Sequence, residues 1–72
     1  MNNPLEILAS MIETAKDEGT AERATTAEGL LTVEANGGVV FYHWREDRDT
    51  AEREITASHA LDILTREIEG GR

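Results

Sequence analysis

The chain has 72 residues and no cysteine, so disulfides and a thiolate zinc site are excluded. Its formal charge is -8, with fifteen acidic residues against seven basic ones. Direct binding to nucleic acid or to an anionic membrane is therefore disfavoured, because both modes need clustered lysine and arginine. We expect one small domain over residues 1–72, which at this length buries only about 60% of its unfolded surface.

The first residues have the signature of a helix start. Asn3 can cap, Pro4 suits the first helical position, and Glu6 stands where a capping box needs an acid. Gly19 is a natural terminator of this helix. Apolar residues recur between these ends at helical spacing. They are Leu5, Leu8, Ile12 and Ala15, joined by Ile7 and Met11 on a neighbouring row.

Acidic side chains gather on the opposite side of this helix. At about 100° per residue, Glu6, Glu13 and Asp17 fall on one face, with Ser10 among them. The stripe runs about 16 Å along the helix axis. It is either a solvated face or a surface for a basic partner.

Residues 20–29 give a weaker signal. Threonines suit an edge strand, although the alanines do not exclude a helical turn. We expect a short edge strand near Glu22–Thr26. Gly29 then admits a strand over Leu30–Ala35.

A β-hairpin over residues 30–45 is the strongest local signal in the chain. Apolar runs flank Asn36-Gly37-Gly38, and glycine supplies positive φ at almost no steric cost. A two-residue loop at Asn36-Gly37 would pair Val33 with Val40. A three-residue loop would pair Val33 with Phe41 instead.

The second hairpin strand is apolar on both of its faces. Its alternating sets are Val40, Tyr42 and Trp44 on one face and Val39, Phe41 and His43 on the other. We expect the first set to face inward with Leu31 and Val33. A strand of this kind is either covered on both sides or meets another molecule. The second set is therefore a candidate self-association face, and a homodimer is the expected assembly.

The segment after Trp44 can be read in two ways. Residues 45–50 are polar and predict an exposed turn that carries Glu46, Asp47 and Asp49. A capping box of Asp49 and Glu52 could start one long helix at Thr50. The apolar stripe becomes coherent only at Ala57, however, so we prefer a strand at about Thr50–Ile55. A helix over Ala57–Glu69, capped by Thr56, then closes the fold.

Catalytic and metal motifs are weak in this sequence. His59 and Asp62 stand at i, i+3 and could share a metal, but two ligands do not make a site. Ser10 and Ser58 lie in no nucleophile turn, and the glycines form no phosphate-binding loop. We therefore expect no enzyme activity, no metal and no cofactor.

The expected fold is α+β. It has an N-terminal helix, an antiparallel sheet of three strands (four with the edge strand) and a C-terminal helix, with both helices on one face of the sheet. No secretory signal or membrane span is recognisable, so a cytoplasmic location is expected.

In size and charge the chain is similar to small phage-encoded inhibitors, including anti-CRISPR and anti-restriction proteins that imitate DNA. The similarity rests on these two properties, so it carries over no site residue. It implies an inhibitor or adaptor that engages a basic, nucleic-acid-binding protein. The candidate surface consists of Glu6, Glu13, Asp17, Glu46, Asp47 and Asp49. The alternative is a structural homodimer whose acidity serves only solubility.

Overall fold

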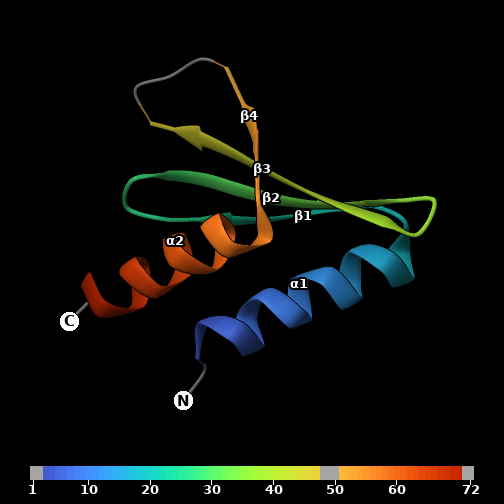
Figure 1. The fold of residues 1–72 in the computed structure, drawn as a ribbon, viewed down its shortest axis with the longest axis horizontal. Helices are drawn as coiled ribbons and strands as arrows, with labels where there is room; N and C mark the ends of the chain where they lie inside the picture. The colour runs from blue at the N-terminus through green and yellow to red at the C-terminus, as the bar shows by residue number, and fades with distance from the viewer. Residues whose placement is uncertain (1–2, 48–50, 71–72) are drawn as a thin grey trace.

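A computed structural model describes residues 3–47 and 51–70 and has the order helix, four strands, helix (Figure 1). The elements are α1 (Pro4–Glu18), β1 (Ala21–Thr25), β2 (Gly29–Asn36), β3 (Val39–Glu46), β4 (Arg53–Ile55) and α2 (Ala57–Gly70). The strands form one antiparallel sheet in the order β1-β2-β3-β4, so each strand pairs with its neighbour in sequence. The expected α+β architecture is confirmed, and the edge strand brings the sheet to four strands.

Local capping interactions fix both ends of α1. The Asn3 side-chain oxygen accepts a hydrogen bond from the Glu6 N–H at 2.8 Å, and Pro4 occupies the first turn. Gly19 takes a left-handed conformation (φ 66°), and its N–H donates to the Ala15 carbonyl at 2.9 Å. Both predicted boundaries of this helix are confirmed.

The predicted order of a strand and then a helix in the C-terminal third is confirmed, but the strand is shorter than the predicted Thr50–Ile55, because Ala51 and Glu52 lie outside it. Residues Arg53–Ile55 pair with β3 as a short strand. The Thr56 hydroxyl then caps α2 by accepting from the His59 N–H at 3.1 Å. A single helix from Thr50 is wrong, because Ala51 and Glu52 are not helical and Ile55 packs on the core from a strand. Asp49 and Thr50 themselves lie outside the described residues.

The hairpin between β2 and β3 forms in a register that neither expected turn gives. Gly37 and Gly38 make the turn with φ of 61° and 83°, and Val33 pairs with Tyr42. Two glycines meet the demand of a tight hairpin turn for two positive φ angles without steric cost. Compared with a loop at Asn36-Gly37, the register shifts by two residues. An even shift leaves every side chain on its predicted face.

The core lies between the sheet and the two helices. Leu31 and Val33 are fully buried, and Trp44 is only 4% exposed. They pack with Leu8 and Met11 of α1 and with Ala60, Ile63 and Leu64 of α2. The inward face predicted for β2 and β3 is therefore confirmed, with Val40 and Tyr42 at its edge.

The apolar stripe predicted for α1 is too wide. Leu5 is 64% exposed, although it was expected to share the buried face of Leu8. It lies in the first turn, about 60° round the helix from Leu8, so it stands at the border of the buried face. Within the described residues, no helix is both long enough and apolar enough to span a bilayer.

Candidate interaction surfaces

The predicted acidic stripe on α1 is exposed along its whole length. Glu6, Glu13 and Asp17 all have exposed side chains, whereas Leu8, Met11 and Ala15 face the core. Glu6 also contributes its backbone N–H to the helix cap, so its position is fixed by local structure. The stripe can therefore meet a cationic partner without any change in the fold.

The acidic residues after β3 lie elsewhere. Glu46 makes an ion pair with Arg53 at 3.4 Å, and the Asp47 N–H donates to the Glu28 carbonyl at 3.0 Å. Asp49 lies outside the described residues. In Figure 1 the end of β3 is at the top of the view and α1 is at the bottom. The acidic stripe of α1 and the acidic residues after β3 therefore lie at separate places, because β3 carries Glu46 and Asp47 away from α1.

Charge is divided unequally between the two layers. The helices α1 and α2 carry seven carboxylates and two cations, Lys16 and Arg66. The four strands carry four carboxylates and three arginines. Most of the negative charge of the protein therefore belongs to the helical layer, and the strands are close to neutral.

The sheet face opposite the helices carries the predicted self-association residues. Val39 is 54% exposed, and Phe41 and His43 are partly buried among their neighbours. His43 Nε2 lies 3.5 Å from a carboxylate oxygen of Glu34 on the adjacent strand. The face is thus apolar near the β2–β3 turn and polar further along. No helix in the described part of the chain packs over it.

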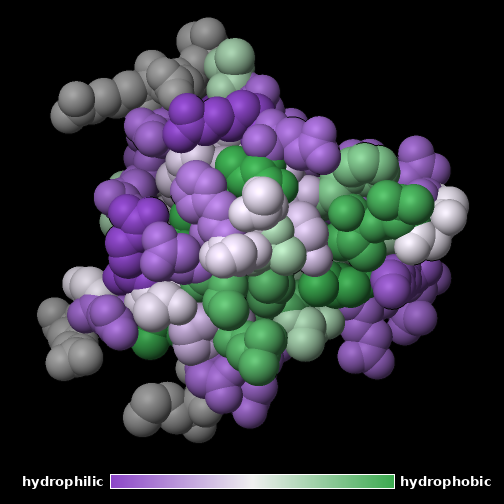
Figure 2. Space-filling model, viewed as in Figure 1, coloured by the Kyte–Doolittle hydropathy of each residue, from purple (hydrophilic) through white to green (hydrophobic). Residues whose placement is uncertain are grey.

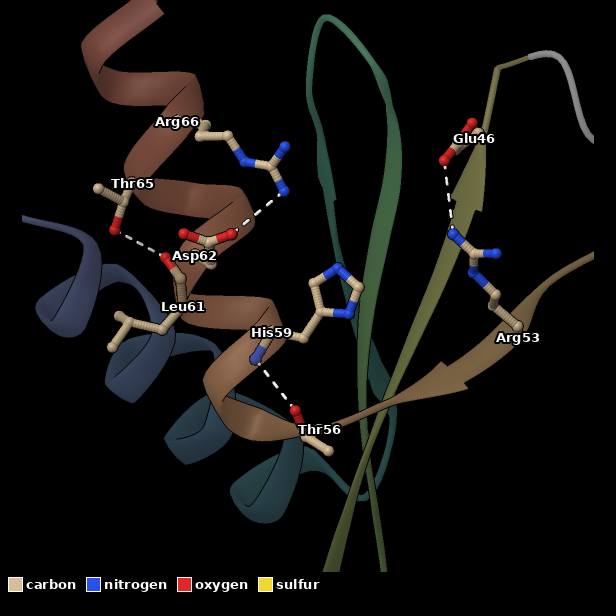
Figure 3. A network of polar contacts seen from close by, with 8 residues as sticks. All are labelled: Glu46, Arg53, Thr56, His59, Leu61, Asp62, Thr65 and Arg66. Atoms are coloured by element: carbon tan, nitrogen blue, oxygen red, sulfur yellow. Dashed lines mark hydrogen bonds and ion pairs between the residues drawn. The ribbon is translucent and has the colours of Figure 1, made fainter.

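A crevice of about 140 Å³ lies between α2, the end of β3 and the start of β4, around His59 and Arg53 (Figure 3). Its polar lining consists of Glu28, Glu46, Arg53, His59 and Arg66. The His59 ring projects from α2 towards the strands (Figure 3). Arg66 binds Asp62 at 3.2 Å, just as Arg53 binds Glu46, so both guanidinium groups already have acidic partners. The crevice is therefore electrically balanced and does not favour an anion.

The described residues supply no third ligand to complete a metal site with His59 and Asp62. Among the residues that the structure describes, no three histidine or acidic side chains are placed to hold a metal ion. Asp62 is instead engaged by Arg66, one turn further along α2. Comparison with known families, curated proteins and solved structures gives no match to this chain.

Two residues that sequence reasoning passed over organise the β1–β2 turn. The buried Thr26 hydroxyl accepts from the Gly29 N–H at 3.0 Å and donates to the Gly29 carbonyl at 3.0 Å. Glu67 of α2 accepts from the Ala27 N–H at 3.1 Å, which ties the turn to the helical layer. A threonine three residues before a glycine is a usable local signal for such a turn. The contact with Glu67 spans forty positions and has no local signal.

Proposed function

We propose that this protein is a non-enzymatic binding module, an inhibitor or adaptor whose acidic helical layer engages a basic protein. The observation that carries the proposal is the excess of carboxylates over cations on the two helices. A one-sided negative field attracts a cationic surface and orients it before contact.

A nucleic-acid-binding protein is the class of partner that this surface suits best. Such proteins line their phosphate-binding grooves with lysine and arginine. A helix with Glu6, Glu13 and Asp17 exposed along about 16 Å presents regularly spaced negative charge to a groove of that kind. The protein would then compete with nucleic acid for the same groove.

Charge reversal by Glu13→Lys with Asp17→Lys tests this proposal. Both residues are exposed, so stability should change by less than about 0.5 kcal/mol. The wild-type protein is immobilised on a resin and incubated with an extract of its source organism. It should retain a basic protein at low salt and release that protein as the salt concentration rises. The double variant should associate with the purified partner at least about tenfold more slowly.

A matched control separates the surface from the net charge. Glu34→Lys with Glu54→Lys changes the charge by the same amount on exposed residues of the sheet. This control should associate nearly as fast as wild type. If the folded Glu13→Lys, Asp17→Lys variant binds like wild type, the acidic layer is only a solvated face.

The second candidate function is a structural homodimer that forms through the outer face of the sheet. It is favoured by the exposure of Val39 beside Phe41 on a face that no described helix covers. A small domain also gains stability by association, because its own core is limited.

Phe41→Glu should dissociate such a dimer without unfolding the monomer. Phe41 lies on the solvent side of the monomer sheet, whereas in a dimer the new carboxylate would be buried without a partner. Sedimentation at micromolar concentration should show the wild type as a dimer and the variant as a monomer. A wild-type monomer at every concentration would contradict the dimer.

A further inference from the structure

An apolar seam runs along the junction of the two helices. Helices α1 and α2 contact each other and run in opposite directions (Figure 1). Leu61 points from α2 towards α1 (Figure 3). Ile68 follows Leu61 by seven residues and therefore lies on the same flank of α2. Ile68 is 37% exposed, and Leu61 is only partly buried.

Helix α1 contributes the other half of this seam. Leu5 and Ile12 are also seven residues apart and share one flank. Because the two helices are antiparallel and lie on the same side of the sheet, corresponding flanks of each helix face the other. The interhelical seam thus consists of Leu5, Ile12, Leu61 and Ile68. It is about 10 Å long, and Figure 2 shows hydrophobic surface where the helices adjoin.

Each residue of the interhelical seam is followed directly by an acid. The pairs are Leu5-Glu6, Ile12-Glu13, Leu61-Asp62 and Ile68-Glu69. One residue further along is about 100° further round a helix, so on both helices the acid turns from the junction towards solvent. All four carboxylates are exposed. The seam therefore has an acidic rim on each side, although on the α2 side Asp62 is already paired with Arg66 at 3.2 Å.

We propose that the interhelical seam docks a basic amphipathic helix of a partner protein. The apolar side of that helix would cover the seam, and its lysine and arginine side chains would reach the acidic rims on both sides. Leucines of the partner at i, i+3 and i+7 would match the length of the seam. Lys16 lies one turn beyond Ile12 on the same flank of α1, so the basic residues of the partner helix would lie over the seam itself and not beyond that end.

The inference rests on the proposed function, and it adds the shape of the partner segment. The test uses two labelled peptides of the same leucine and lysine composition, each about 20 residues long, enough for a stable helix. One peptide has leucines on a single helical face, and the other has them scrambled. Fluorescence anisotropy should show the amphipathic peptide binding at least about tenfold more tightly.

Leu5→Ser with Ile68→Ser should remove this preference and leave binding of the scrambled peptide unchanged. Val39→Ser is the matched control, because Val39 is an exposed apolar residue on the sheet side. It should keep the preference in full. Leu5→Ser alone is a milder variant at the most exposed of these positions, and it should lose several-fold in affinity for the amphipathic peptide.

Amide shift mapping locates the bound peptide. Shifts confined to α1 and α2 would support the seam, and shifts on β3 would overturn it. If the Leu5→Ser, Ile68→Ser variant still prefers the amphipathic peptide, the seam is not its binding site, but the proposed acidic binding module is unaffected. Absence of binding by either peptide at low salt would overturn both proposals. Self-association of the wild type that Leu5→Ser abolishes would show that a second copy occupies the seam, and would also overturn the inference.

Discussion

Replacing Trp44 with alanine is expected to unfold most of the protein at room temperature. Trp44 is 4% exposed and pairs with the fully buried Leu31 in the centre of the core. Truncating a buried tryptophan costs about 3–5 kcal/mol, and a single core in a chain of this size supplies a net stability of about the same amount. Because Trp44 is the only tryptophan, far-UV circular dichroism in a urea titration is the suitable measurement.

Phe41→Ala provides the comparison from the opposite face of the same strand. Phe41 is only partly buried and lies outside the core cluster. Its truncation should lower the free energy of unfolding by about 1 kcal/mol, within the ordinary range for single substitutions. Equal losses for the two variants would mean that the faces of β3 are energetically alike. A Trp44→Ala variant with the wild-type urea midpoint would contradict the placement of the core.

The features that sequence reasoning predicted are those with a local cause. Asn3, Gly19 and Thr56 end or begin helices through hydrogen bonds that span three or four residues. Side-chain alternation sorts the residues of β3 into two faces, and a register shift of two residues leaves both sets unchanged. Which set faces inward depends on the turn, and a three-residue loop would have reversed it. These predictions needed no knowledge of where the elements meet.

The features that sequence reasoning missed depend on how distant elements pack. A helical wheel shows which residues lie on the apolar side of a helix but not which part of that side the sheet covers, so Leu5 and Leu8 are equivalent until the sheet is placed. The separation of Glu46 from Glu13 depends on the path of β3 through the sheet. The interhelical seam exists only because α1 and α2 lie antiparallel, although each apolar–acidic pair is visible in the sequence.

The role of Gly29 also depends on how distant parts of the chain pack. Gly29→Ala is expected to destabilise the protein by about 3 kcal/mol, the upper end of the range for overpacking. A Cβ on Gly29 would contact the carbonyl oxygen of Arg45, and it would lie 2.9 Å from the Cα of Glu46. Both atoms belong to the backbone of β3, so no side-chain rotation can relieve the overlap. The start of β2 would have to move away from β3. That movement would also strain the hydrogen bonds between Gly29 and Thr26.

Gly70→Ala is the control that isolates this close approach. Gly70 ends α2, and among the described residues a Cβ there would meet no atom within 4 Å outside its own turn of helix. Alanine in place of glycine in a helix contributes up to about 1 kcal/mol, so this variant should unfold at the same urea concentration or a slightly higher one. Thermal and urea unfolding of the two variants side by side give the comparison. If Gly29→Ala has the same unfolding midpoints as Gly70→Ala, β2 and β3 are further apart at Gly29 than the structure places them. If only Gly29→Ala is destabilised, glycine is required at this position by the backbone of β3 rather than by a turn.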